Sequence, residues 1–227
     1  MRNWRTTLRL HALQRRYYRG DETAVPQYIE LLAQARQSHI ARLNLPRKPV
    51  ALHLGSGGHH IDGWINVDFE IAEHPDLVVD LTSTLPFASE SADYIHSEDF
   101  IEHVDLEAGR TFLRECSRVL RRGGVLRLLT PDLDALIRRV YLDRERRHLA
   151  WCANSFGGDT PAEALNMHLR MKGDHRFVYD DELLSRELKA AGFHVRRVRY
   201  NRSPDPFLRF LDLRDFGLNL FFEGVKG

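Results

Sequence analysis

The chain has only two cysteines and no long apolar run, and these absences exclude several classes of protein. Cys116 and Cys152 are too few for a disulfide framework and are not spaced like zinc ligands, so we expect both to be packing residues. No apolar stretch approaches the roughly 20 residues that a membrane span needs. Arginines are spread through Met1–Gly20, where a signal peptide would have its apolar centre. We therefore expect a cytoplasmic protein without a membrane span.

The charges are unevenly divided along the chain, although the net charge is only +1. Residues 1–48 contain ten Lys or Arg and three Asp or Glu, which gives +7 and leaves −6 for the rest. Within this part, the apolar residues of "VPQYIELLAQARQSHIARL" have helical spacing. We predict a basic helical N-terminal extension of two helices over residues 1–48, followed by one globular domain over residues 49–227.

The domain alternates strand-like and helix-like segments, the pattern of a parallel sheet covered by helices. Helices are predicted near residues 107–120, 133–149 and 180–191. No helical segment separates the last two strands, so the last strand can run antiparallel to its neighbour. We predict an α/β fold: a Rossmann-like, seven-stranded, mostly parallel sheet with helices on both faces and an antiparallel last strand. The predicted strands are residues 50–54, 64–68, 77–80, 92–96, 125–129, 193–200 and 218–225.

A glycine-rich turn, Gly55-Ser56-Gly57-Gly58, follows the first predicted strand. Glycine lets the backbone approach a ligand closely, although such a turn alone is also common as an ordinary tight turn. A dinucleotide site would have a phosphate-binding helix next, and its ribose-binding acid about 20 residues on. Here Asp68 comes too soon, and "HHIDGWIN" leaves little or no room for that helix. The spacing favours a nucleoside without phosphates, with its ribose held by Asp68.

Three segments, "LHLGSGG", "VVDLTSTLPFASESADYI" and "FLRECSRVLRRGGVLRLLTPD", follow the order and spacing of the class I S-adenosylmethionine-dependent methyltransferases. From about Val50 to its end, the chain resembles the methyltransferase type 11 group in particular. It departs from the group at His53, Ser56 and His59, where an acidic residue, Cys and Gly are common. The resemblance implies S-adenosyl-L-methionine as the cofactor. The residues that it assigns to this cofactor are Gly55, Ser56, Gly57, Asp68, Phe69, Asp80, Leu81 and Ser97.

Three candidate catalytic residues follow the fourth predicted strand, in "HSEDFIEHVD". If a helix begins here, Asp99, Glu102 and His103 fall at i, i+3 and i+4 on one face. We expect His103 to remove a proton from the methyl acceptor. The segment also resembles the Glu-x-x-Glu-His pattern of the ubiquinone-pathway O-methyltransferases, which is associated with a divalent metal. A metal held by this trio is an open alternative that we do not expect, and another is that Glu102 and His103 only fix the helix start.

A polar, basic and aromatic segment at about residues 151–179 lies where the resembled group has its substrate cover. Such a composition suits an oxygen-rich substrate. We expect His175 and Tyr179 to line the substrate pocket.

The leading hypothesis for function is S-adenosylmethionine-dependent O-methylation of a hydroxyl group on a small molecule or saccharide. A nicotinamide oxidoreductase is disfavoured because the phosphate-binding helix is missing. A non-catalytic nucleoside-binding scaffold, docking a partner through its basic N-terminal helices, is the alternative that the fold alone does not separate from an enzyme. No recognised motif points to specific nucleic-acid binding, and the sequence gives no indication of oligomeric state.

Overall fold

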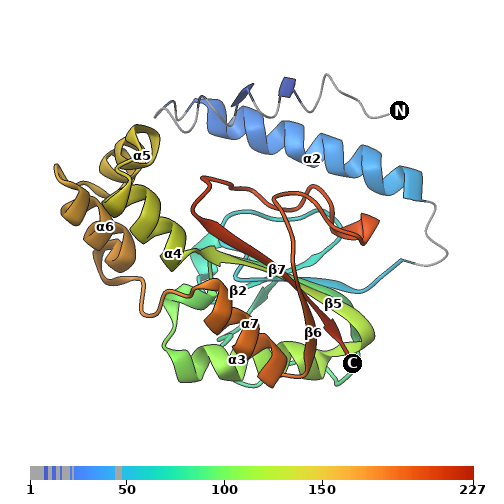
Figure 1. Cartoon of the computed structure of the whole chain (residues 1–227). Coiled ribbons are helices and arrows are strands. Elements are labelled where there is room, and N and C mark those ends of the chain that lie inside the picture. The colour runs from blue at the N-terminus through green and yellow to red at the C-terminus, as the bar shows by residue number, and fades with distance from the viewer. Residues whose placement is uncertain (1–7, 10–11, 14–15, 17–20, 22, 44–47) are drawn as a thin grey trace.

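A seven-stranded sheet forms the centre of the structure (Figure 1). The computed structural model describes residues 8–9, 12–13, 16, 21, 23–43 and 48–227. The strand order is β3-β2-β1-β4-β5-β7-β6, and only β7 runs antiparallel to its neighbours, which confirms the predicted topology. The strands are β1 (Ala51–Leu54), β2 (Ile65–Asp68), β3 (Leu77–Val78), β4 (Ala92–Glu98), β5 (Leu120–Pro131), β6 (Phe193–Arg197) and β7 (Asn219–Lys226).

One face of the sheet is covered by α3 (Leu106–Val119) and α7 (Asp181–Ala190). α3 begins at Asp105, whose carboxylate accepts a hydrogen bond from the backbone N–H of Ala108 at 2.9 Å, as expected of an N-cap. Its apolar residues, including Phe112 and Cys116, recur on one helical face and are fully buried in the main core. Cys116 is therefore a packing residue, as predicted.

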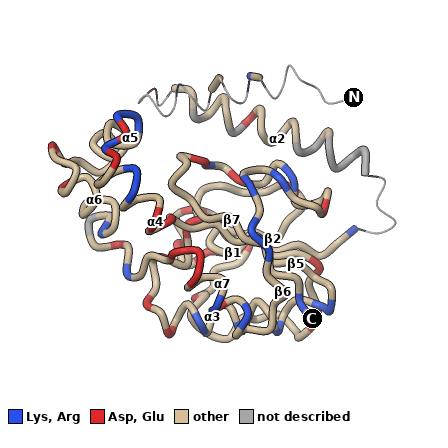
Figure 2. Tube along the Cα trace, in the orientation of Figure 1, with Lys and Arg blue, Asp and Glu red and all other residues tan. Residues whose placement is uncertain are grey.

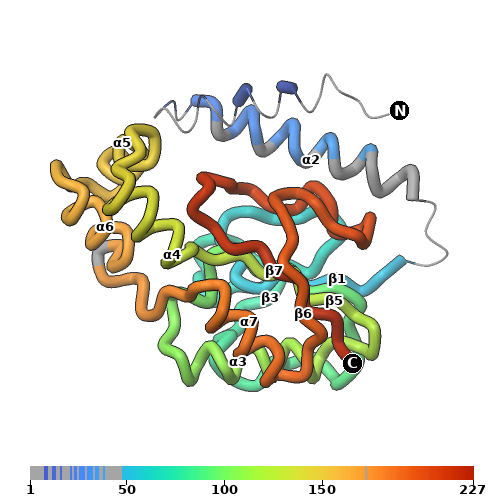
Figure 3. The backbone as a smooth tube through the Cα atoms, in the orientation of Figure 1, coloured from blue at the N-terminus to red at the C-terminus, as the bar shows by residue number. Residues whose placement is uncertain are grey.

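The opposite face is covered by residues 199–216, which we call the strap. Phe207 and Leu208, in a short 3-10 turn (Pro206–Leu208), pack with Trp64 on this side of the sheet. The helix α2 (Ala24–Leu43) crosses above the strap (Figure 3). Tyr28, Leu31 and Leu32 of α2 contact Phe210 and Leu213 of the strap. Helices thus lie on both sides of the sheet, but on this side the strap separates the helix from the strands.

The cover predicted at about residues 151–179 contains two helices, α5 (Arg146–Phe156) and α6 (Pro161–Arg170). The prediction of one helix over residues 133–149 was wrong. The chain forms α4 (Leu133–Leu136) and a π-helical turn (Ile137–Leu142), and it breaks where Arg144 adopts a left-handed φ of 51°.

Of the two predicted N-terminal helices, α2 is present, and the first falls largely outside the described residues. None of the helices in the described part of the chain combines the length and apolar character that a membrane span requires.

Candidate active site

The glycine-rich turn connects β1 to β2 without any helix, as predicted. Gly55 has a φ of +72°, and a Cβ there would lie 2.8 Å from Cβ of Phe100, so glycine is needed for packing. Gly57 has a φ of +48°, and a Cβ there would meet nothing within 4 Å. The backbone at Gly57 is therefore open to a ligand, whereas Gly55 serves the fold.

Asp68 ends β2 beside this turn. Its Oδ2 accepts a hydrogen bond from the backbone N–H of Gly57 at 2.7 Å, and its Oδ1 accepts one from that of Glu70 at 2.9 Å. Each carboxylate oxygen has a second lone pair, so both can still accept from a ribose hydroxyl. Next to Asp68, the side chains of Phe69 and Ile71 are 72% and 71% exposed, which is unusual for large apolar residues so close together. An open backbone, an acceptor carboxylate and uncovered apolar surface fit the ribose and adenine of S-adenosylmethionine.

The other residues assigned to the cofactor differ in how accessible they are. The Asp80 carboxylate accepts hydrogen bonds from the backbone N–H and the hydroxyl of Thr82, at 2.9 and 2.6 Å. Leu81 is 3% exposed in the main core, so its side chain does not offer a surface to adenine. Ser97 is also buried, and its hydroxyl has no hydrogen-bond partner among the described residues. Both bonds of Asp80 are on Oδ1, so its exposed carboxylate can still accept from a ligand, whereas the Leu81 side chain is part of the core.

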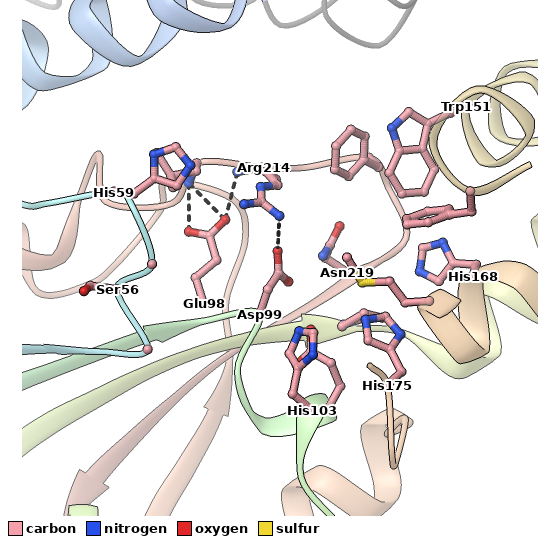
Figure 4. A pocket seen from close by; sticks show the side chains of 18 of the residues that line it. Ser56, His59, Glu98, Asp99, His103, Trp151, His168, His175, Arg214 and Asn219 are labelled. Carbon is pink, nitrogen blue, oxygen red and sulfur yellow. Dashed lines mark hydrogen bonds and ion pairs between the residues drawn. The ribbon is translucent and has the colours of Figure 1, made fainter. Parts of the chain in front are cut away.

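A cavity of about 270 Å³ opens at the carboxyl edge of the sheet (Figure 4). Gly55, Ser56 and Gly57 line one side of it, and Trp151, on α5, lines the other. Ligands of open α/β sheets bind at this edge. Asp68 and Phe69 lie outside the lining. The cavity thus leads away from the cofactor turn, towards the cover.

Two acidic residues at the end of β4 hold the strap against the cavity. Glu98 is buried and accepts hydrogen bonds from the backbone N–H groups of Leu213 and Arg214, at 2.9 and 3.0 Å. Asp99 accepts one from the Arg214 guanidinium at 2.8 Å (Figure 4). Burial and the nearby Asp99 raise the pKa of Glu98 to about 8. One oxygen of Asp99 is therefore paired with a cation, while its Oδ1 is buried without a hydrogen-bond partner among the described residues.

The prediction that Asp99, Glu102 and His103 share one helical face was wrong. Asp99 adopts a left-handed φ of 53°, and only a single 3-10 turn (Ile101–His103) follows it. The residue that joins Glu102 and His103 is instead His175, from the cover. The His103 and His175 rings have centroids 5.0 Å apart and stand edge to face. Sequence spacing could not show this pairing, because it depends on how the cover folds back.

Burial changes the protonation of several cavity residues. It lowers the pKa of His175 to about 4, with His103 as the second cause, and it lowers that of His168 to about 3. Both rings are therefore neutral near pH 7. Glu102 is fully buried, and this burial, followed by the charge of Asp99, raises the pKa of its carboxyl well above the usual range.

Aromatic rings from the cover and the strap form one wall of the cavity, and this wall was not predicted from the sequence. The rings of Trp151 and Phe216 are stacked with centroids 4.0 Å apart, and Phe156 lies 5.2 Å from Trp151. All three line the cavity. Phe216 comes from the strap, a segment without strand or helix periodicity that gave no signal beforehand.

Tyr179 does not lie in the cavity, contrary to the prediction. It is 1% exposed in the main core, and its hydroxyl lies close to Gly109, where a Cβ would be only 2.6 Å away. Its aromatic side chain packs beneath the site. His175, in contrast, does line the cavity, as predicted.

Comparison with known proteins agrees with this geometry. Residues 63–128 match the family model Methyltransf_11, described as a methyltransferase domain. The match covers less than a third of the chain, from the turn before β2 into β5. The family match indicates an S-adenosylmethionine-dependent methyltransferase, and the seven-stranded fold agrees with it. A comparison with curated proteins finds no match.

Several solved structures share the fold of this methyltransferase at low sequence identity. An S-adenosylmethionine-dependent methyltransferase from Archaeoglobus fulgidus is 15% identical with a TM-score of 0.53, covering 87% of this chain and 94% of its own. Phosphoethanolamine N-methyltransferase 2 of Haemonchus contortus, in complex with S-adenosyl-L-methionine, is 14% identical with a TM-score of 0.51, covering 85% and 52%. A protein described as a methyltransferase, in complex with the Haloferax volcanii Trm112 methyltransferase activator, is 14% identical with a TM-score of 0.52, covering 83% and 87%. At these identities the likeness concerns the fold.

Proposed function

We propose that the protein transfers a methyl group from S-adenosylmethionine to a hydroxyl group of a small molecule or saccharide. The observation that carries this proposal is one cavity with the cofactor turn at one end and His103, His175 and an aromatic wall at the other. Methyl transfer needs a donor and an acceptor in line within one enclosed space. The turn that would hold the donor borders the cavity that would hold the acceptor.

The cofactor would be held by residues whose surroundings fit it. Asp68 would accept hydrogen bonds from the ribose, Phe69 would pack on the adenine, and the Gly57 backbone would face the ligand. S-adenosylmethionine supplies a methyl group on a positively charged sulfur, which makes it a strong electrophile. The protein then has two tasks: to position the acceptor oxygen and to take its proton.

The acceptor would lie between the histidines and the aromatic wall. Flat aromatic faces such as those of Trp151 and Phe216 pack well on a phenol ring or on the apolar face of a sugar. The neutral His175 and the neighbouring His103 would face its hydroxyl group. We assign removal of the hydroxyl proton to His103.

A screen with S-adenosylmethionine carrying a labelled methyl group tests this function. The panel would contain phenols, sugars and hydroxy acids, with amines included because the N-methyltransferase named above shares the fold. We expect label in a hydroxyl-bearing compound. Methylation of amines alone would contradict the choice of acceptor atom.

Once an acceptor is found, His103→Ala should lower turnover by roughly 10²- to 10⁴-fold, the usual contribution of a general base. Binding of S-adenosylhomocysteine should be unchanged, because His103 is not among the residues assigned to the nucleoside. His60→Ala is the matched control, since His60 is exposed and does not line the cavity. A His103→Ala enzyme with full turnover would remove His103 from the chemistry.

A further inference from the structure

Glu102, His103 and His175 form a cluster of metal-ligating groups that lines the cavity. Figure 4 shows His103 and His175 next to each other. One ligand atom from each residue lies within 4.8 Å of those of the other two. Glu102 and His103 are adjacent in the sequence, and His175 comes from the cover, so their meeting with His175 is a product of the fold. Two imidazoles and one carboxylate are a donor set that binds divalent transition metals.

The backbone holds this cluster in place. Immediately after His175, the N–H groups of Arg176 and Phe177 both donate to the carbonyl oxygen of Glu102, at 2.7 and 3.1 Å. The cover is thereby tied to the 3-10 turn that carries Glu102 and His103. The three side chains are brought together before any ligand arrives.

Glu102 gives an independent indication of a ligand. Its side chain is fully buried, and its Oε2 accepts a hydrogen bond from the Thr130 hydroxyl at 2.9 Å. Its Oε1 is buried without a hydrogen-bond partner among the described residues, and the same is true of Nδ1 of His175. Buried polar atoms are rarely left without a partner, because desolvation then costs free energy that nothing offsets. A bound cation would offset it.

We propose that Glu102, His103 and His175 bind a divalent transition metal ion of the zinc type. The nitrogen donors disfavour Mg²⁺ and Ca²⁺, which prefer oxygen ligands. The Thr130 hydroxyl orients the Glu102 carboxylate, in the manner of groups that support metal ligands. Asp99 is not a member of this cluster, and its Oδ2 pairs with Arg214.

Three protein ligands leave a coordination position open towards the cavity, as in catalytic zinc sites. A hydroxyl oxygen bound there would have a lowered pKa. In that case His103 would bind the metal and would not take the proton itself, and the proton of the bound hydroxyl would pass to water in the open cavity. Metal binding itself requires neither the acceptor nor the cofactor, so it can be measured separately from methyl transfer.

The test is a zinc titration of the full chain, with any polyhistidine tag removed and bound metal stripped with EDTA. Competition with a chromophoric chelator reports affinity and stoichiometry. We expect one high-affinity Zn²⁺ per chain, and a loss of about tenfold or more in affinity in His175→Ala and in Glu102→Gln. Each variant would first be shown to be folded by circular dichroism. His175 is only half-buried, so we expect His175→Ala to fold. This variant can therefore test the proposal even if Glu102→Gln does not fold.

Two control variants define the ligand set. His168→Ala removes a cavity histidine whose ring lies 6.0 Å from that of His175 but which is outside the cluster, and Asp99→Asn tests the trio expected from the sequence. His168→Ala should bind Zn²⁺ like the unaltered protein, and Asp99→Asn should lose much less affinity than His175→Ala, because it removes a nearby charge and not a ligand. The proposal is overturned if the unaltered chain shows no saturable site, if His175→Ala binds equally well, or if either control loses affinity to the same degree.

Discussion

Glu98 lies in an environment unlike that of an ordinary surface carboxylate. It is buried at the end of β4, with His96 at 3.6 Å and the backbone N–H groups of Leu213 and Arg214 as donors. Three charged groups influence the pKa of Glu98: Asp99 and Asp212 repel its negative charge, and Arg214 attracts it. Desolvation is the largest of these effects and raises its pKa to about 8.

This raised pKa predicts a pH dependence of stability. The folded protein keeps a proton on Glu98 that the unfolded chain releases above its ordinary pKa of 4.5. The stabilisation is fully present below that pH and is lost as the pH rises towards 8. Glu98→Gln cannot ionise, but its amide oxygen can still accept from the strap. Urea denaturation at pH about 5 and about 8 should therefore show a smaller difference in unfolding free energy for Glu98→Gln than for the unaltered protein. An equal difference would show that other groups set the pH dependence.

At the level of single residues, the sequence predicted the location of the site more accurately than it predicted the role of each residue. Gly57, His103 and His175 lie on the cavity because strand ends and the cover could be recognised from their patterns. The prediction that Tyr179 lines the pocket was wrong, because an aromatic residue just before a helix can lie in a core as well as in a pocket. The part played by Glu98 was not foreseen, because it depends on contacts with a strap more than 100 residues away in the sequence.

Among the elements, the strap is held by a buried ion cluster. Arg127 of β5 is fully buried and pairs with Asp212 of the strap and with Glu223 of β7, the latter at 2.8 Å. It also donates to the carbonyl oxygens of Arg199 and Arg202, both at 3.1 Å. Burial alone would lower the pKa of Arg127, but the two carboxylates outweigh it and raise the pKa. Figure 2 shows the basic residues of the strap beneath α2.

Removing the cation from this cluster should destabilise the protein strongly. Arg127→Met leaves the buried Asp212 carboxylate without its cation and leaves Glu223 with Arg196 alone, and breaking such a buried pair typically costs about 3–5 kcal/mol. Chemical denaturation measures this change in unfolding free energy. Arg138→Met is the matched control, because the side chains of Arg138 and its partner Asp134 are 64% and 67% exposed. The denaturation midpoint of this variant should barely change. Similar effects in the two variants would mean that the buried cluster is not important for stability.

The helix α2 should behave as an accessory element. Neither of the two clusters that pack on the sheet contains a residue of α2, whose Tyr28, Leu31 and Leu32 form a separate cluster that includes Phe210 and Leu213 of the strap. Deletion of residues 1–48 should therefore leave the domain folded, as judged by its circular dichroism spectrum. It should also increase the rate of hydrogen exchange in residues 210–216. Leu32→Ala should reproduce part of the exchange effect, and Gln34→Ala, at an exposed position, should not. Loss of the folded spectrum on deletion would place α2 in the core.

For the whole molecule, the fold was predictable because each strand carries a local signal. Short apolar runs, glycine turns and the helical pattern at α3 made the seven strands and their directions predictable. The strap was not predictable, since its conformation depends on Arg127, Asp212 and Glu223 meeting in three dimensions. The broken helix at residues 137–145 depends likewise on packing that a periodic pattern does not contain.

The central claim is that the glycine turn and Asp68 bind the nucleoside of S-adenosylmethionine, and calorimetry tests it most directly. S-adenosylhomocysteine should bind the purified protein with a Kd in the micromolar range, and NAD should not bind, because no helix follows the turn to hold its phosphates. Asp68→Ala should weaken S-adenosylhomocysteine binding by about 1–3 kcal/mol, the cost of losing hydrogen bonds to a charged acceptor. No heat of binding with S-adenosylhomocysteine, or an affinity unchanged in Asp68→Ala, would contradict the account.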